Sequence, residues 1–231
     1  MTYPKAVLFG SIGTLAETSE LQRQAFNQAF IAHGLDWVWD QPLYQALLRT
    51  PGGINRIEAF ARAEMIAVDA KAIHASKTRI YHLLLDGDVL APRDGVAETL
   101  AWARQMGIRT GLVSTTSRAN IDQLLDALAP MIGAADFDII CDASNITAVK
   151  PAPDVYQYAL TKLGLSAMEA VAIEDTEASL TAAVSAGLPA IAFPGENAAG
   201  DDFSTASLTV HNISAEAVSR ACSLQMAAEV A

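Results

Sequence analysis

Short apolar runs that alternate with helix-like segments are the feature that most narrows the fold of this chain. Six such runs occupy residues 6–9, 108–114, 137–141, 170–174, 189–193 and 207–210. Several of them are apolar without alternation, which is typical of strands that are covered on both faces. Segments with helical periodicity lie between them, for example at 95–107, 120–128 and 153–164. This order predicts an α/β core with a parallel sheet and helices on both faces.

One long interval between the first two apolar runs has a different character. It contains four helical patterns, at residues 20–34, 41–50, 54–67 and 72–85, and no convincing strand. We therefore expect a helical cap formed by residues 17–88 and inserted directly after the first strand. The α/β core would then consist of residues 1–16 and 89–231.

Composition narrows the class of ligand. Of 231 residues, 52% are hydrophobic and 18% are charged, which predicts a large folded core and little disorder. The formal net charge is −11, with only 15 basic residues, and this disfavours nonspecific binding to nucleic acid. An anionic ligand would have to be bound by a few well-placed donors rather than by a positive surface.

The sequence favours a cytoplasmic protein. Its two cysteines, Cys141 and Cys222, are far apart and are expected to be buried thiols in a reducing compartment. The first residues lack the apolar segment and small-residue cleavage site of a secretory signal. No apolar run approaches the roughly 20 residues that a membrane span needs. Neither a membrane nor a nucleic acid is expected as a partner.

Polar residues follow the predicted strands at the edge where parallel sheets bind ligands. Ser114 follows the second strand, Lys150 lies in the loop after the third, and Glu174 and Asp175 end the fourth. A hydroxyl and a lysine suit a phosphate group, and carboxylates suit Mg²⁺. Each also has a simpler explanation: Ser114 as the cap of a helix beginning near Arg118, Lys150 as an exposed loop lysine, and the acidic pair as a helix cap.

Four segments together resemble the haloacid dehalogenase superfamily of phosphohydrolases. They are KAVLFGSIGTLAETSE, GLVSTTSR, VKPAPDVYQYALTKLG and AIEDTEASLTAAVSAGLPAIA, which span almost the whole chain. The segment AFIAHGLDWVWD and the residues up to GGINRI are similar to the cap of the β-phosphoglucomutase-like branch, and particularly to its bacterial xylulose-bisphosphate phosphatases. The resemblance implies a Rossmann-like core, an inserted helical cap and hydrolysis of a small sugar phosphate.

The resemblance also implies roles for individual residues. Ser114 and Thr115 would bind the phosphoryl group, and Lys150 would pair with it. Glu174 and Asp175 would supply the acidic motif that holds Mg²⁺. Arg56, in GGINRI, would contact a substrate phosphate from the cap, and Thr14 would stabilise the turn after the first strand.

The first motif departs from the family pattern at its two chemical positions. The pattern is Asp-x-Asp-Gly-Thr, in which the first Asp is the nucleophile and the second is the general acid/base. Gly10 and Ile12 stand at these positions, so no catalytic carboxylate is intact. With one anionic ligand missing, Mg²⁺ is expected to bind weakly if it binds at all. Glu17, Gln22 and Ile54 replace an Asp, a frequent His and a cap Lys of the relatives.

No other residue is an obvious substitute for the missing pair. Ser11 has no His or carboxylate beside it in the sequence to activate its hydroxyl. The histidines are interpreted as surface or packing residues; they are His33, His74, His82 and His211. Glu17 as a substitute carboxylate is equally disfavoured.

Three hypotheses follow for the function. The leading one is a catalytically impaired member of the family, a pseudoenzyme that keeps phosphate binding and takes phosphate or a small phosphorylated metabolite. The first alternative is an active phosphoric-ester hydrolase with an unusual mechanism. The second is a non-catalytic interaction protein in which the retained site residues serve no ligand.

Overall fold

The computed structural model describes residues 3–50, 52–87, 90–198 and 200–230. The chain divides into two compact units, one formed by residues 1–17 and 90–231 and the other by residues 18–89. Each boundary lies one residue after the position expected from the helical patterns. We call the first unit the core and the second the cap, and describe each by itself.

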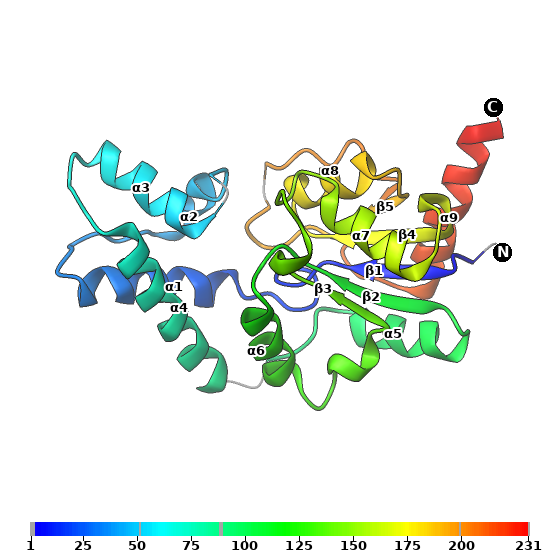
Figure 1. Ribbon diagram of the computed structural model, residues 1–231, viewed down its shortest axis with the longest axis horizontal. Helices are drawn as coiled ribbons and strands as arrows, with labels where there is room; N and C mark the ends of the chain where they lie inside the picture. Colours follow the sequence, from blue (N-terminus) through cyan, green and yellow to red (C-terminus); the bar gives the residue numbers. More distant parts are fainter. Residues whose placement is uncertain (1–2, 51, 88–89, 199, 231) are drawn as a thin grey trace. The chain divides into compact units, whose positions relative to one another are not determined.

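The core is built on a six-stranded parallel sheet with the order β3-β2-β1-β4-β5-β6 (Figure 1). The strands are β1 (Ala6–Phe9), β2 (Arg109–Val113), β3 (Ile139–Cys141), β4 (Ala170–Glu174), β5 (Ala190–Ala192) and β6 (Leu208–Thr209). All six lie within the apolar runs of the sequence, so the expected α/β class is confirmed. Strands β1 and β4 are buried along their whole length, which explains why their sequences do not alternate.

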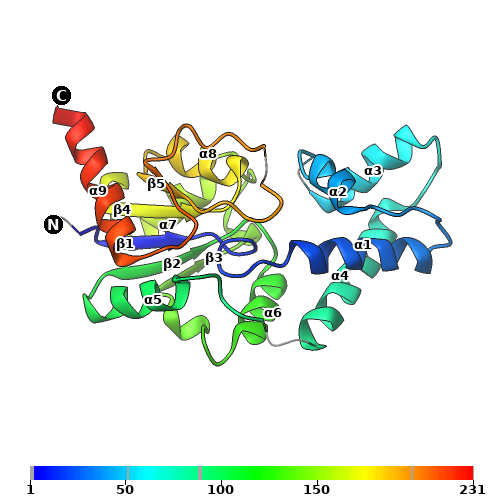
Figure 2. The ribbon, with the colours of Figure 1, turned by 180° about the vertical axis from the view of Figure 1, so that it is seen from behind.

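Helices cover both faces of this sheet (Figures 1 and 2). Val7 and Phe9 point into one apolar cluster, and Ala6 and Leu8 point into another, because successive side chains of a strand face opposite ways. The helices packed in the first cluster are α5 (Val96–Gln105), α6 (Arg118–Leu128) and α9 (Ala215–Val230). Those in the second are α7 (Asp154–Leu163) and α8 (Glu177–Ser185). Short 3₁₀ turns occupy Ala134–Asp136, Ala143–Asn145 and Ala167–Glu169.

The register of the central strand brings the predicted ligand loops together. Phe9 pairs with Leu112 of β2 on one side and with Ile173 of β4 on the other. The next residue, Gly10, donates its N–H to the carbonyl oxygen of Ile173 over 2.9 Å. The residues that follow β1, β2 and β4 therefore leave the same edge of the sheet, with β1 in the middle.

The cap consists of four helices around an aromatic core. They are α1 (Ser19–Ala32), α2 (Gln41–Leu47), α3 (Gly53–Ala63) and α4 (Ala70–Gly87). Trp39 is fully buried and lies 4.8 Å from Phe26 and 4.7 Å from Phe30, measured between ring centroids. Such aromatic pairs bury large areas, so they hold short helices that would be marginal alone. No helix in the described parts of either unit has the length and apolar character needed to cross a membrane.

Candidate functional site

Two buried hydroxyls meet where β1 and β2 end. Ser11 is 7% exposed and Ser114 is 4% exposed, and the Ser11 hydroxyl donates to Ser114 Oγ over 2.7 Å. Ser114 Oγ also accepts the backbone N–H of Thr116 over 3.2 Å. Thr115, between these two, is half-buried. The β2 loop thus presents a hydroxyl that is held in place by two donors.

Glu174, the last residue of β4, is a shared hydrogen-bond acceptor for buried polar groups at this edge of the sheet. Its side chain is 1% exposed, and Oε1 accepts hydrogen bonds from Lys150 Nζ and from the Tyr156 hydroxyl. Lys150 Nζ also donates to the carbonyl oxygen of Val113 over 3.0 Å, next to Ser114. Burial, with the Glu174 carboxylate beside it, raises the pKa of Tyr156 well above its usual value. Lys150, Tyr156 and Glu174 therefore form one buried, mutually satisfied group.

Asp175 contacts the turn that follows β1. Thr14 Oγ1 donates to Asp175 Oδ1 over 3.1 Å. The residue keeps part of its surface exposed, but loss of water around its carboxyl raises the pKa to about 7, with the charge of Glu174 adding to the effect. Gly13 has a φ of +84°, and a Cβ there would collide with the Asp175 carboxylate. A glycine is thus required at this position of the turn.

Gly10 leaves no empty space for a side chain. A Cβ built on Gly10 would stand 2.5 Å from Thr14 Oγ1 and closer still to Glu174 Oε2, nearer than real Cβ atoms approach other atoms. Ile12 is half-buried and packs against the apolar cluster of the first sheet face. At both positions of the Asp-x-Asp pattern, the neighbouring groups thus pack closely around the residue that is present, glycine at 10 and isoleucine at 12.

The simpler explanations of the loop residues do not hold. Helix α6 is capped by Ser117, which accepts the N–H of Asn120, and Ser114 is not its cap. Helix α8 is capped by Thr176, which accepts the N–H of Ser179, and the acidic pair precedes it. The side chain of Lys150 is 9% exposed, so it is not an exposed loop lysine. The hydroxyl, amine and carboxylates are thus not needed for helix capping or solubility.

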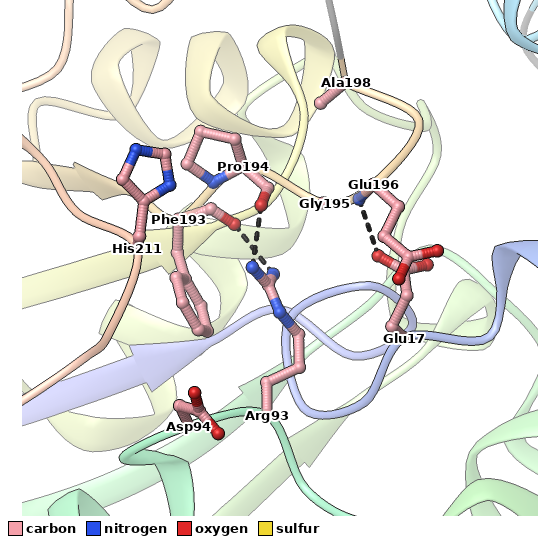
Figure 3. Close-up of a pocket in the computed structure, with 9 residues that line it drawn as sticks. All are labelled: Glu17, Arg93, Asp94, Phe193, Pro194, Gly195, Glu196, Ala198 and His211. Carbon is pink, nitrogen blue, oxygen red and sulfur yellow. Dashed lines mark hydrogen bonds between the residues drawn. The ribbon is translucent and has the colours of Figure 1, made fainter.

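A cavity of about 490 Å³ opens beside the β1 loop within the core (Figure 3). Arg93 lies against the Phe193 ring, 3.5 Å from its centroid, and donates to the carbonyl oxygens of Gly13, Phe193 and Pro194. On the opposite side of the cavity, Glu17 accepts the backbone N–H of Glu196 over 2.8 Å. Arg93 thereby fixes the β1 loop to the loop after β5.

Within the cap, three basic side chains gather on α3 and α4. Arg56 is 8% exposed and donates to the carbonyl oxygens of Leu47 and Thr50. Lys77 is 7% exposed and donates to Gln22 Oε1. Burial lowers the pKa of Lys77 to about 7, and the charge of Arg56 contributes. The pKa of His74 is lowered by burial and then by both cations.

This basic group has no carboxylate partner among the described residues. The ion pairs found there do not include Arg56, His74 or Lys77. Buried charges are normally paired, because taking an isolated charge out of water is costly. The cluster is therefore suited to an anion.

Comparison with known proteins identifies the family of this chain. The family model described as haloacid dehalogenase-like hydrolase matches residues 4–187. The chain belongs to the haloacid dehalogenase-like hydrolases. This confirms the family expected from the four motifs.

The relatives place the chain in the expected branch of the haloacid dehalogenase-like hydrolases. The CbbY protein of Rhodobacter capsulatus is 41% identical over 217 residues, covering 92% of this chain and 95% of the relative. The crystal structure of Rhodobacter sphaeroides CbbY with phosphate is 38% identical, covers 90% of this chain and 94% of that one, and has a TM-score of 0.83. An Asp-to-Asn mutant of the same protein, with xylulose-(1,5)bisphosphate, has a TM-score of 0.82 at 36% identity and the same two coverages. The β-phosphoglucomutase of Bacillus subtilis is 29% identical over 198 residues, covering 81% of this chain and 82% of that one.

Hydrolases of this family typically use Mg²⁺, but the donor set of this chain does not fit that ion. Gly10 offers no carboxylate, and one oxygen of Glu174 is bound by Lys150 and Tyr156. One oxygen of Asp175 accepts from Thr14. In the described part of the chain, no three His, Cys, Asp or Glu side chains are grouped to hold a metal. Mg²⁺ is usually held by one or two carboxylates, with waters completing its octahedron, so the missing carboxylate at position 10 removes a principal ligand.

Several residues of these sites were not found from the sequence. Tyr156 lies on the buried face of α7 between Val155 and Ala159, where an apolar residue would be expected. Lys77 had a clear signal, because it stands four residues after Ile73 and four before Tyr81, on the buried face of α4. His74, interpreted as a packing or surface residue, lies beside two buried cations. Arg93 carried no recognisable pattern.

Proposed function

We propose that this haloacid dehalogenase-like protein binds a small phosphorylated sugar without hydrolysing it at ordinary enzyme rates. The observation that carries the proposal is the arrangement at Gly10, where Glu174 and Thr14 surround the place at which a nucleophile's side chain would begin. A carboxylate is absent, and the space for one has been filled. The protein is then a pseudoenzyme of a phosphatase family.

The chemical reason lies in the two steps that hydrolysis of a phosphate ester needs. A nucleophile must attack phosphorus, and an acid must protonate the leaving oxygen. Glycine and isoleucine do neither. Removing the nucleophile of an unrelated hydrolase lowers turnover by on the order of 10⁴–10⁶-fold, so loss of both groups leaves little more than binding.

Donors for a phosphate remain at the core edge. The Ser114 hydroxyl and the Lys150 amine lie close together, since Lys150 bonds the carbonyl of the residue before Ser114. Charge-assisted hydrogen bonds of this type are the strong ones in phosphate recognition. Lys150 also bonds Glu174, so a bound phosphate would share the amine with that carboxylate.

The cap, taken by itself, also contains a group of residues suited to an anion. Arg56, Lys77 and His74 form a buried basic cluster without an acidic partner in the described residues. The Rhodobacter sphaeroides relative was crystallised with xylulose-(1,5)bisphosphate, which carries two phosphates. A sugar bisphosphate is therefore the ligand class that we propose.

Titration calorimetry and a phosphate-release assay test this proposal together. Xylulose 1,5-bisphosphate and inorganic phosphate are the probes, with Lys150→Met and Lys77→Met as site variants. The exposed Lys162 in the core and Lys71 on α4 give matched controls, Lys162→Met and Lys71→Met. We expect the bisphosphate to bind the wild type and both controls, and each site variant to bind it about tenfold or more weakly.

The outcomes separate the alternatives. Turnover of the bisphosphate by the wild type at about 1–10³ s⁻¹ would show an active hydrolase with another nucleophile. Absence of binding to both probes would leave a non-catalytic interaction protein. Binding that is unchanged in Lys150→Met and Lys77→Met would place the ligand elsewhere.

A further inference from the structure

Ser11 has an environment that its place in the motif does not explain. It occupies the middle position of the Asp-x-Asp pattern, and its buried side chain forms a hydrogen bond with Ser114. The turn holds it firmly, because its carbonyl oxygen accepts the N–H of Thr14 over 3.2 Å and of Leu15 over 2.8 Å. The backbone of the β1 loop therefore fixes the position from which the Ser11 side chain extends.

The contacts of Ser114 determine what its hydroxyl can do. A serine hydroxyl has one proton to donate and two lone pairs to accept with. Ser11 Oγ and the N–H of Thr116 both donate to Ser114 Oγ, which occupies the two lone pairs. When Ser11 is the donor in this pair, the described residues supply no other hydrogen-bond acceptor for the proton of Ser114. That hydroxyl is left as a donor only, the state that binds an oxyanion.

We propose that Ser11 is a positioning residue that donates to Ser114 and so directs the Ser114 proton to a bound tetrahedral oxyanion such as phosphate. The inference rests on the proposed phosphate site of the core. It adds Ser11 as a residue that acts through Ser114. It also means that the absence of a carboxylate at position 10 affects the hydrogen bonding of Ser114. With no carboxylate at residue 10, no charged acceptor on that residue competes for the Ser114 proton.

A double-mutant cycle with inorganic phosphate tests the coupling. The variants are Ser11→Ala, Ser114→Ala and the double variant, with phosphate affinity measured by calorimetry and folding checked by thermal unfolding. We expect Ser11→Ala to weaken phosphate binding about fivefold, the size of one neutral hydrogen bond. Because Ser11 acts through Ser114, adding Ser11→Ala to Ser114→Ala should change the affinity less than twofold.

Two further variants separate positioning from packing. Ser11→Thr keeps the hydroxyl and should keep the wild-type affinity. Ser11→Cys keeps the shape with a weak donor and should lose affinity as Ser11→Ala does. If Ser11→Ala does not fold, the comparison of Ser11→Thr with Ser11→Cys still tests the proposal.

Each contrary result has a distinct meaning. Additive losses in the double variant would overturn the proposal, since Ser11 would then act without Ser114. Unchanged affinity in Ser11→Ala and Ser11→Cys, with loss in Ser114→Ala, would overturn it while leaving the phosphate site in place. Failure of the wild type to bind phosphate at all would remove the proposed function itself.

Discussion

The carboxylate of Glu174 lies beside Gly10, in the space that any side chain at position 10 would enter. Gly10 is the first residue after β1, and Glu174 is the last residue of the neighbouring strand β4. The same carboxylate accepts Lys150 and Tyr156 on its other oxygen. Gly10 and the position of the Glu174 carboxylate are thus two parts of one arrangement, because a side chain at position 10 would require Glu174 to move.

Restoring the family pattern should restore Mg²⁺-dependent phosphate release, provided that room is made for it. Gly10→Asp with Ile12→Asp supplies nucleophile, acid/base and metal ligand together. Adding Glu174→Asp shortens the carboxylate that blocks position 10. We expect the triple variant to exceed the double variant by about tenfold in phosphate release from xylulose 1,5-bisphosphate, an estimate that equals about 1.4 kcal/mol of barrier.

Two comparisons control this experiment. Gly10→Asp alone should gain less than the double variant, because the leaving oxygen stays unprotonated. The triple variant carrying Gly10→Asn, which has the same size but no nucleophile, should be inactive. Equal activity with Asn and Asp at position 10 would mean that the restored aspartate is not the nucleophile.

A methyl group alone at position 10 should destabilise the core. In Gly10→Ala the new Cβ meets Glu174 and Thr14, and overpacking of a buried site costs about 1–3 kcal/mol of the free energy of unfolding. Urea unfolding measures this cost. Glu174→Ala in the same chain should make the added cost of Gly10→Ala much smaller, and an equal cost in both backgrounds would show that Glu174 is not the obstacle.

The wild type should bind Mg²⁺ no more tightly than millimolar, because Gly10 supplies no carboxylate and one oxygen of Glu174 is bound by Lys150 and Tyr156. Isothermal calorimetry with MgCl₂ measures the affinity, and the triple variant Gly10→Asp, Ile12→Asp, Glu174→Asp is the matched comparison. Micromolar affinity in the wild type would contradict the prediction. Tighter binding by the triple variant than by the wild type is the expected contrast.

Stability should depend on pH through the buried amine of Lys77. Its pKa in the folded chain is about 7, below the ordinary lysine value of 10.5. Between these values the unfolded chain takes up a proton that the folded chain does not, so the free energy of unfolding falls as pH falls from about 10.5 to 7. The shift sets an upper limit of about 5 kcal/mol for this loss.

Lys77→Met removes the titrating group and should abolish this part of the pH dependence. The variant should therefore gain stability relative to the wild type as pH falls from about 10 to 7. Urea unfolding at several pH values measures the difference, and Lys71→Met, exposed on the same helix, should show no such trend. A constant difference between Lys77→Met and the wild type at all pH values would refute the expected titration.

The strands were predictable because their signal is strong and local. Apolar runs such as 170–173 are buried on both faces of the sheet, so no polar residue interrupts this one before Glu174 at its end. The edge at which Ser114, Lys150 and Glu174 gather also followed from the topology, since every ligand loop leaves the carboxyl end of a parallel strand.

The sequence did not predict which side chains would contact one another at the site. Nothing in the β1 segment indicates that Glu174 would occupy the space at Gly10, because the two residues are 164 positions apart and meet only through the sheet. The hydrogen bond between Ser11 and Ser114 was not predicted for the same reason, since these residues are also far apart in the sequence. The cap cluster was missed for another reason: charged residues on helices are usually exposed, and Lys77 is buried by the aromatic side chains of Phe26 and Tyr81.

The central place of β1 has an evolutionary consequence. Backbone hydrogen bonds fix the strand to a neighbour on each side, and its side chains are buried in both apolar clusters. None of that attachment requires an aspartate at the loop that follows. Evolution can therefore exchange residues of this loop, as at Gly10 and Ile12, without disturbing the sheet that holds the loop in place.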